Sequence, residues 1–533
     1  MKIRILLVTA FSVALGAAQV KEKAPGGPLS VKENPIPRLI KKDGRYALLV
    51  DGAPYLMLGA QVHNSSAWPG VLPKVWPAID ALNVNTVEIP VYWEQFEPRR
   101  GQFDYSVVDA LLAQARQHSV RLVLLWFGTW KNGSQHYMPE WMKLDPERYP
   151  HILDKNGKPA DSPSPFAEAS LEADKRAFTA FMRHLKSADP QRTVIMVQVE
   201  NEPGTWGHLR DYSPAAQKLF EAPVPKEVLA AMHVQPATAE PDWKEAFGEG
   251  EGDVCFHAWS VARYIEQVAA AGKAVYPLPM YVNAALRNPF HGAPGTYESG
   301  GPTDNVIPIW RVAAPSIDLV APDIYERDPA AYLKVLDLYH RDDNALFVPE
   351  TGSDVVNARF LFAALGHGAI GFAPFGMDYV EGDREERFKP FAMNNRLLGP
   401  MQREVARLNF EGKLQAVSEE KGKVAQTLSF GAWNANVSYG SVRNSPPRGH
   451  PEPVGRILIA QLKENQFLVT GSYGRVDFAP VEPGKQRQFL KVEEGAYEKG
   501  VFRFVRIWNG DETDWGLNFG GEPVVLRVSL GTY

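Results

Sequence analysis

Along residues 56–373, short apolar segments alternate with segments whose apolar residues recur at helical spacing. The runs 121–127 and 193–199 are almost continuously apolar, whereas 105–118 carries an apolar stripe on one helical face. Apolar strands that alternate with helices are typical of a parallel sheet covered by helices on both faces. We predict eight such strands, at 56–62, 86–90, 121–127, 193–199, 280–283, 317–322, 346–349 and 370–373.

Eight strand-helix repeats predict a closed (β/α)8 barrel, the TIM barrel, which takes roughly 250 residues or more. The competing α/β fold is an open, doubly wound sheet, but no GxGxxG turn follows an early strand. A hairpin is predicted before the barrel, from 40–50 and 53–58 around the turn Asp51-Gly52. Two stretches rich in Pro or Gly, 203–253 and 284–308, interrupt the alternation and are predicted to be long loops.

The pattern changes after about residue 410, where helical periodicity ends and short strands joined by turns take over. This pattern predicts a smaller all-β domain, a β-sandwich. The predicted strands are 414–417, 424–427, 456–461, 466–470, 474–478, 501–508 and 524–529.

The first residues have the pattern of a secretory signal peptide. Lys2 and Arg4 precede an apolar run at 5–15, and small residues follow at 16–18. A membrane anchor is the alternative, but a span needs about 20 apolar residues. We therefore predict a secreted or periplasmic protein, free of the membrane after cleavage. The predicted parts are a signal peptide (1–18), a leader (19–37), the barrel with its hairpin (38–400) and the sandwich (410–533).

Charge and composition exclude several classes of function. The chain has 57 Lys and Arg against 62 Asp and Glu, a net charge of −5, and no long basic run. Nucleic acid is therefore not expected as a partner. The 12 His residues lack metal-ligand spacing, so neither a metal nor a cofactor is predicted. The single Cys255 cannot form an intramolecular disulfide and is expected to be buried and inert.

Two glutamates stand where predicted barrel strands end. Glu202 follows the strand at 193–199, and Glu350 directly follows the strand at 346–349. Polar residues at these strand ends face the catalytic side of a barrel. Cleavage of a glycosidic bond needs one carboxyl group to protonate the leaving oxygen and one to attack or to activate water. A helix cap or a surface ion pair is the alternative for a single glutamate, but two in such contexts favour catalysis.

The strings around these glutamates resemble a known family. Val-Gln-Val-Glu-Asn-Glu at 197–202 and Phe-Val-Pro-Glu-Thr-Gly at 347–352 are similar to the β-galactosidases of glycoside hydrolase family 35. That family belongs to the large clan A of (β/α)8 retaining glycosidases. The resemblance covers roughly residues 40–380, and the C-terminal part resembles the small β domain of a bacterial branch. Pro203 and the strand end at 59–64 depart from the family pattern.

The resemblance implies a role for each matching residue. Glu202 is expected to be the acid/base and Glu350 the nucleophile of a double displacement. Asn201 is expected to bond the sugar 2-hydroxyl, and Tyr325 to hydrogen-bond the nucleophile. Retention of configuration requires the two carboxyl groups to lie about 5–5.5 Å apart. The implied partner is an oligosaccharide with terminal galactose, such as a xyloglucan side chain of the plant cell wall, cleaved by an exo-acting enzyme.

Five further residues are candidate substrate contacts. Glu94 follows the second strand and is expected either to bond a sugar hydroxyl or to form a salt bridge. Trp126, Trp130 and Asn132 follow the third strand as a candidate sugar platform, with plain core as the alternative for Trp126. His63 is expected to contact the sugar or to orient neighbouring carboxylates. Weaker candidates for the cleft and its support are Glu200, Trp206, His208, Asn283, Trp310 and Phe375.

Two other functions stay open at this point. One is a different retaining glycosidase of the same clan, such as a β-glucosidase, a β-xylosidase or an endo-glycanase, because no motif reports an axial 4-hydroxyl. The other is a non-catalytic carbohydrate-binding protein on a barrel scaffold. A homodimer is also left open by the sequence.

Overall fold

The computed structural model describes residues 34–379, 384–441 and 447–533. The predicted signal peptide at 1–18 lies outside the described residues, as does most of the predicted leader at 19–37. In the described ranges, no helix is long and apolar enough to cross a membrane.

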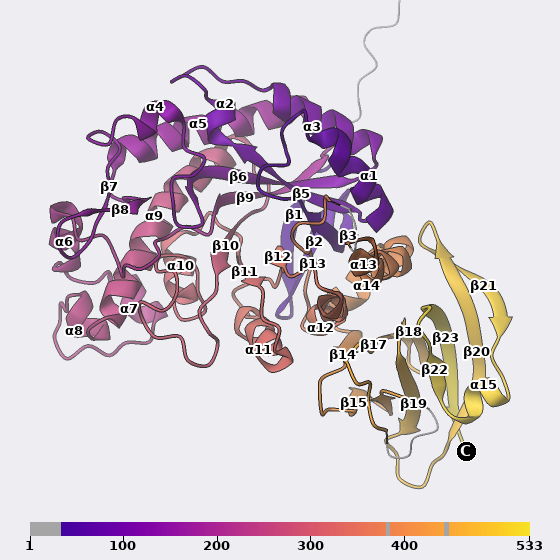
Figure 1. Cartoon of the computed structure of the whole chain (residues 1–533). Coiled ribbons are helices and arrows are strands. Elements are labelled where there is room, and N and C mark those ends of the chain that lie inside the picture. The colour runs from indigo at the N-terminus through magenta and orange to yellow at the C-terminus, as the bar shows by residue number, and fades with distance from the viewer. Residues whose placement is uncertain (1–33, 380–383, 442–446) are drawn as a thin grey trace, which may run out of the picture.

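Eight parallel strands form the barrel at the centre of the molecule (Figure 1). Their spatial order is β12-β11-β10-β9-β6-β5-β4-β13. Val348, just before β12, bridges Phe372 of β13 in parallel register and closes the ring. The predicted (β/α)8 barrel is therefore confirmed. The strands are β4 (Met57–Gln61), β5 (Thr86–Tyr92), β6 (Arg121–Lys131), β9 (Val194–Asn201), β10 (Met280–Ala285), β11 (Leu319–Ile324), β12 (Glu350–Thr351) and β13 (Gly371–Phe372).

The strands differ in length for reasons visible in the sequence. β5 is buried at every position, as is β6 after its first residue, because both faces are covered. The strand predicted at 346–349 is reduced to a bridge at Val348, and the strand that follows has two residues. Pro349 interrupts it, since proline has no N–H to donate to a neighbouring strand.

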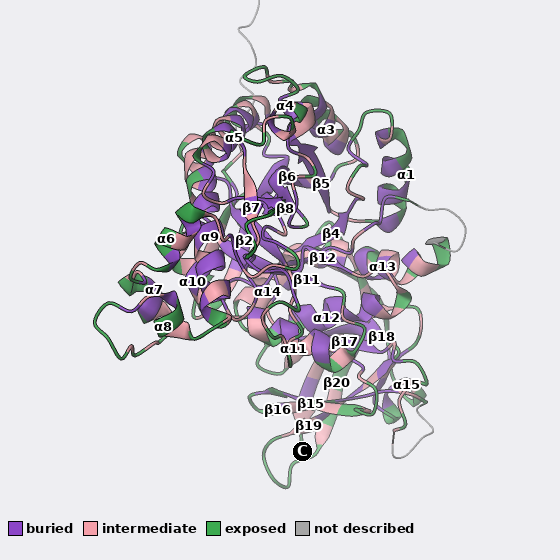
Figure 2. Ribbon diagram, turned by 60° about the vertical axis from the view of Figure 1, so that its left-hand side comes forward, coloured by how far each residue is buried: buried purple, intermediate pink, exposed green. Residues whose placement is uncertain are grey.

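Helices surround the barrel and turn their apolar faces toward it, as the buried inner surfaces in Figure 2 show. In the helix at 168–188, Ala173, Ala177 and Phe181 recur at four-residue spacing and are all buried. The main helices are α1 (Leu72–Leu82), α3 (Ser106–Gln117), α5 (Glu168–Ala188), α9 (Glu251–Val275), α10 (Ile307–Ala313), α11 (Pro329–Tyr339), α12 (Phe360–Gly366), α13 (Arg384–Leu398) and α14 (Gln402–Phe410).

Two helices after the barrel were not predicted. Pro390 lies inside α13, and a proline normally argues against a helix interior. Phe388 and Phe391 nevertheless bury this helix against the barrel. In α14, only Val405 and Leu408 are fully buried, too few to stand out as a periodic pattern.

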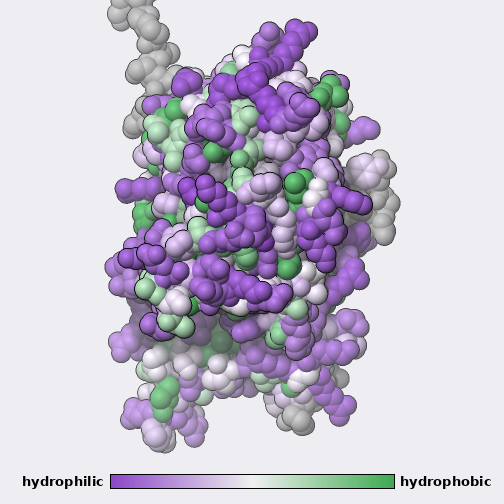
Figure 3. All heavy atoms as spheres, turned by 90° about the vertical axis from the view of Figure 1, so that its left-hand side faces the viewer, coloured by the Kyte–Doolittle hydropathy of each residue, from purple (hydrophilic) through white to green (hydrophobic). Residues whose placement is uncertain are grey.

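The long predicted loop at 203–253 contains short helices. They are α6 (Pro214–Phe220), α7 (Lys226–Ala231) and α8 (Trp243–Phe247). Figure 3 shows the face that carries these helices, on which hydrophilic residues predominate and hydrophobic ones are scattered. Shorter elements elsewhere in the barrel are α2 (Trp93–Phe96), α4 (Glu140–Lys143), β7 (His151–Leu153), β8 (Pro159–Pro163) and the 3-10 helices η1 (Val355–Arg359) and η2 (Gly399–Met401).

The C-terminal part is a sandwich of two antiparallel sheets. One sheet has the order β14-β17-β18-β23-β20-β21 and the other β15-β16-β19-β22. Side chains from both sheets, including Trp433, Ile457, Phe478 and Val528, form one core. The elements are β14 (Leu414–Ser418), β15 (Ala425–Phe430), β16 (Trp433–Ser438), β17 (Arg456–Lys463), β18 (Gln466–Ser472), β19 (Gly474–Pro480), β20 (Arg487–Glu498), β21 (Val501–Ile507), α15 (Asp511–Asp514), β22 (Leu517–Phe519) and β23 (Val524–Thr532).

The sandwich is packed directly on the barrel. Helix α12 contacts β14 and β17, and Leu414, Leu458 and Leu468 belong to the same hydrophobic cluster as the barrel core. The N-terminal strands β1 (Arg38–Lys42), β2 (Arg45–Val50) and β3 (Ala53–Tyr55) form a small antiparallel sheet, and α14 packs against β2 and β3. Barrel, hairpin and sandwich therefore share a continuous interface.

Candidate active site

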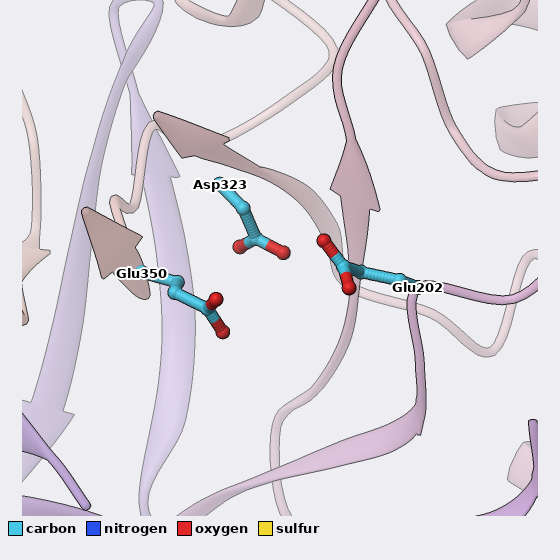
Figure 4. Close-up of side chains that lie close together, drawn as sticks. All are labelled: Glu202, Asp323 and Glu350. Carbon is cyan, nitrogen blue, oxygen red and sulfur yellow. The ribbon is translucent and has the colours of Figure 1, made fainter. Parts of the chain in front are cut away.

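Three carboxyl groups meet at the ends of β9 and β11 and at the start of the two-residue strand β12. They belong to Glu202, Asp323 and Glu350, and one oxygen of each lies within 4.8 Å of the others (Figure 4). Asp323 and Glu350 are only 3% and 6% exposed. The predicted pair Glu202 and Glu350 is thus brought together. The approach suits the carboxyl separation of about 5–5.5 Å in retaining glycosidases, and is short of the roughly 6.5–9.5 Å of inverting ones.

The backbone at the end of β9 does not follow regular strand alternation. Glu200 and Glu202 both have positive φ, 63° and 43°. Regular alternation would place both side chains on one side, but the structure separates them. The Glu202 N–H donates to Asn283 Oδ1 at 2.9 Å, and its carbonyl accepts from the Gly133 N–H at 2.9 Å. These two bonds fix Glu202 at the rim of the barrel.

Glu200 turns away from Glu202 and Glu350 toward the helix layer. Its Oε2 accepts from the Trp130 N–H at 2.7 Å. Burial, and then the charge and hydrogen bond of Asp174 on α5, raise the pKa of Glu200 well above its ordinary value. Two buried carboxyl groups in contact share a proton, because both cannot be ionised there. Glu200 therefore contacts Trp130 and Asp174 and does not join the cluster of Glu202, Asp323 and Glu350.

Tyr325 holds Glu350. Its hydroxyl donates to Glu350 Oε1 at 2.5 Å, while the second carboxyl oxygen is buried without a partner among the described residues. Burial and the nearby charge of Glu350 raise the pKa of Tyr325, so the hydroxyl keeps its proton and remains a donor. This hydrogen bond fixes the orientation of the Glu350 carboxyl group.

The environment of Glu202 favours a protonated carboxyl group. Burial, followed by the negative charge of Glu350, raises the pKa of Glu202 to about 7, and Lys131 opposes this shift. A general acid works best when its pKa lies near the working pH.

Asp323 was not singled out in the sequence, although it stands at the end of an apolar strand. Its Oδ2 accepts from Asn283 Nδ2 at 2.6 Å, and its Oδ1 is buried without a partner among the described residues. Burial and the charges of Glu350 and Glu202 raise the pKa of Asp323 well above its ordinary value. Asn283 therefore links Asp323 to the backbone of Glu202. It was named from the sequence only as a lining residue.

Lys131 and Glu298 are also near the site and were missed. Lys131, at the end of β6, is 4% exposed and donates to Asn132 Oδ1. Burial and the charge of Glu202 raise the pKa of Glu298 well above its ordinary value, and Lys131 opposes this shift. A lysine that ends an apolar strand is a detectable signal. Glu298 has no comparable signal, because it lies in the irregular stretch 284–308.

Asn201 is fully buried beside Glu202. Neither its amide oxygen nor its amide nitrogen has a partner in the described part of the chain. An amide with free donor and acceptor groups is suited to bond a sugar hydroxyl. The predicted contact to the 2-hydroxyl stays a prediction.

The other candidates occupy different positions around the strand ends. His63 Nδ1 lies 2.7 Å from Asp378 Oδ1, and its ring meets Phe375 edge-on at 5.2 Å. Glu94 forms an ion pair with Lys143 at 3.4 Å, which is the salt bridge considered as the alternative. Asn132 is exposed and has positive φ, 52°.

The predicted sugar platform is not formed by Trp126 and Trp130. Trp126 is fully buried, stacks on Phe181 and donates from Nε1 to Asp174 on α5 at 3.0 Å. Trp130 packs edge-on against Tyr264 of α9 at 4.8 Å. Both rings are therefore packed against helices of the outer layer, Trp126 against α5 and Trp130 against α9. Trp126 is thus a core residue, which was the alternative considered for it.

Glu202, Asp323 and Glu350 are also the group of side chains in the described ranges that could share a cation. The sequence predicts no metal, and this stays a prediction. The raised pKa values of Glu202 and Asp323 favour their neutral forms, so the cluster carries less negative charge than three ionised carboxylates would.

Comparison with family models gives two matches. Residues 74–266 match Glyco_hydro_42, described as Beta-galactosidase, and residues 391–520 match a domain of unknown function, DUF5597. The first match includes Glu202 and ends before Glu350. The resemblance is therefore supported at the level of a β-galactosidase of clan A, and the family model that matches is that of family 42, not family 35.

Among known proteins, a Beta-galactosidase of Xanthomonas manihotis is 29% identical over 171 residues, or 29% of this chain. The match spans about a quarter, 25%, of that relative's length. A solved β-galactosidase from Bacillus circulans sp. alkalophilus matches with a TM-score of 0.51 at 9% identity, over 89% of this chain and 99% of that one. This likeness shows the fold. A β-galactosidase from the psychrophilic Marinomonas ef1 matches with a TM-score of 0.48 at 12% identity, over 66% and 61% of the two chains.

Proposed function

We propose that this protein is an exo-acting, retaining β-galactosidase that removes terminal β-galactose from an oligosaccharide. The observation that carries the proposal is the approach of Glu202 and Glu350 to within 4.8 Å, with Tyr325 bonded to Glu350. The choice of galactose is supported by the match of residues 74–266 to a β-galactosidase family.

The reaction begins when Glu350 attacks the anomeric carbon and the glycosidic C–O bond breaks. Glu202 donates its proton to the leaving oxygen, so that the released sugar leaves as an alcohol and a glycosyl-enzyme remains on Glu350. Glu202, now ionised, removes a proton from water as that water attacks the same carbon. The ester bond to Glu350 breaks, galactose leaves with retained configuration, and Glu202 regains its proton.

Two finer parts of the proposal concern the substrate and the location. We propose side chains of plant cell-wall oligosaccharides such as xyloglucan as the natural substrate. The signal-like sequence at 1–18 supports a secreted or periplasmic enzyme. The family model that matches residues 74–266 is that of family 42. The proposed reaction is the one that the resemblance to family 35 implied.

The main competing function is a retaining glycosidase for another sugar. A panel of nitrophenyl β-glycosides separates the two, because only the sugar differs between substrates. We expect the highest kcat/KM with the galactoside, and NMR during hydrolysis should show β-galactose as the first product. A clear preference for glucoside or xyloside, or α-galactose as the first product, would contradict the proposal.

The other competing function is a non-catalytic carbohydrate-binding protein. Turnover that depends on Glu350 would exclude it. We expect Glu350→Gln to lower kcat by several orders of magnitude without changing the unfolding temperature. Glu172→Gln is the control, because Glu172 lies on helix α5, pairs with Lys175 and is not a candidate site residue. Equal activity of wild type and Glu350→Gln would show that Glu350 is not the nucleophile.

A further inference from the structure

A cavity of about 850 Å³ lies at the junction of barrel and sandwich. Its barrel wall comes from η1 and α13, and its sandwich wall from residues around the start of β17 and the end of β18. The three clustered carboxyl groups of the candidate active site do not line it. Because η1 follows β12 in the chain, the cavity lies toward the same end of the barrel as those carboxyl groups. Its size is that of a small-molecule site.

Arg456 is a buried cation in the wall of this cavity. It is 4% exposed, and its bonds go to two neutral acceptors, Asn394 Oδ1 at 2.7 Å and the Val454 carbonyl at 3.0 Å. No ion pair joins it to a carboxylate in the described part of the chain. Burial lowers the pKa of Arg456 to about 10. Buried charges are normally paired, so this guanidinium is suited to an anionic partner.

Further cations stand around Arg456. Arg387 is half-buried, and its Nε has no partner among the described residues, although another nitrogen pairs with Asp354 at 3.0 Å. Arg359 and Lys389 also line the cavity. The acidic lining residues, Glu386 and Glu522, are both exposed. The buried charges of the lining are therefore the cations Arg359 and Arg456, whereas the exposed Lys389 pairs with Glu386 at 3.8 Å.

The rest of the lining is apolar or aromatic. Val355, Val356, Pro390, Met393 and Pro453 contribute apolar surface, and the ring of Tyr473 is 40% exposed. The C–H face of a pyranose ring packs on surfaces of this kind, and Tyr offers a flat one. An inorganic anion such as sulfate has no apolar surface to pack against these residues. Cations beside an aromatic ring instead match a sugar that carries a carboxylate.

We propose that this cavity binds a carboxylate-bearing saccharide, a uronic acid residue of an acidic polysaccharide. Arg456 and Arg387 hold the carboxylate, since a guanidinium bonds both of its oxygens at once. Tyr473 packs on the sugar ring. Arg456 and Tyr473 lie in the segment that matches the domain of unknown function, so the site assigns that segment a role in binding. The proposal does not depend on the hydrolysis of galactosides.

Calorimetric titration of the full chain with trigalacturonate tests the site. Saturating galactose is present throughout, so that the active site is occupied. We expect saturable binding that weakens in about 0.5 M NaCl, because the contact is ionic. Arg387→Gln and Arg456→Gln should each weaken binding about tenfold, as expected for the loss of a charged hydrogen bond. Arg396→Gln is the matched control, because it removes one charge from the same helix, α13, outside the cavity.

Arg456 also bonds Asn394, so its replacement can disturb the junction itself. Arg387→Gln and Tyr473→Ala are therefore the deciding variants, with unfolding temperatures recorded for each. Absence of binding overturns the proposal, as does equal weakening in Arg396→Gln. Equal binding of neutral galactotriose, or displacement of the sugar by low concentrations of sulfate, overturns the role of a carboxylated sugar. Failure to hydrolyse galactosides would refute the proposed enzyme and leave this site standing.

Discussion

At the scale of single residues, the protonation of Glu202 sets the pH range of the proposed reaction. Its pKa is raised from an ordinary value near 4.5 to about 7, so the acid form persists at neutral pH. As the pH rises through this pKa the proton is lost, and with it the ability to protonate the leaving oxygen. We predict that kcat/KM falls above about pH 7.

A pH-rate profile with a β-galactoside checks this prediction. A dinitrophenyl galactoside is the control, because its leaving group needs no proton and the fall in kcat/KM should be weaker. Constant kcat/KM well above neutrality with an alkyl galactoside would contradict it.

Asp323 is expected to work as a neutral acid. Three carboxyl groups within 4.8 Å of one another cannot all be ionised in a buried site. The raised pKa of Asp323 indicates that it keeps a proton, which its free Oδ1 can present to Glu202. We predict that Asp323→Asn, which is neutral and the same shape, preserves the pH profile and most activity. Asp323→Ala should cost about 10–100-fold in kcat/KM, because Asn283 then loses its acceptor.

pH-rate profiles and unfolding curves of both variants, measured in parallel with the wild type, test whether Asp323 is neutral. If Asp323→Asn moves the alkaline limb to lower pH, Asp323 is ionised in the working enzyme and raises the pKa of Glu202 by its charge. That outcome would refute the neutral form.

At the scale of secondary-structure elements, the contact between α12 and β14 joins barrel to sandwich. A Cβ at Gly366, the last residue of α12, would lie 2.0 Å from the carbonyl oxygen of Ala416 in β14. The Ala416 carbonyl belongs to the backbone of a paired strand, so it cannot move aside as a flexible side chain can. We predict that Gly366→Ala lowers the free energy of unfolding by about 1–3 kcal/mol.

Denaturant unfolding measures this effect. Gly399→Ala is the control, because nothing lies within 4 Å of its Cβ position and its φ is ordinary. Equal stability of the two variants would mean that β14 is free to shift away from the helix.

Element-level prediction succeeded where the apolar pattern was strong. β5 and β6, buried along nearly all of their lengths, were found with the correct first residue, although they extend to Tyr92 and Lys131, beyond the predicted ends at 90 and 127. α13 was not, since Pro390 and many charged residues hide a helix whose buried side chains are few. In the sandwich, only two residues of β20 are fully buried, so its alternation of charged and apolar residues is too weak to be recognised.

At the scale of the whole molecule, the barrel, its closure and its packing on the sandwich place strand ends side by side. Asp323 and Glu350 lie opposite each other on the neighbouring strands β11 and β12, although they are 27 residues apart in the sequence. Asn283 is two strands from Glu350 and reaches both Asp323 and Glu202. The cavity beside Arg456 exists only because η1 and α13 face the sandwich.

The sequence by itself determined the period of each segment, the strand-helix alternation and the position of Glu202 and Glu350 at strand ends. These properties are local, since each depends on neighbours a few residues away. Only the tertiary structure decided that Asp323 joins the two glutamates, that Glu200 turns back to Asp174, and that Trp126 is core. Strand pairing around the closed barrel and the positive φ at 200 and 202 determine which side chains meet. The pattern of residue types along the chain reports neither the strand pairing nor these φ values.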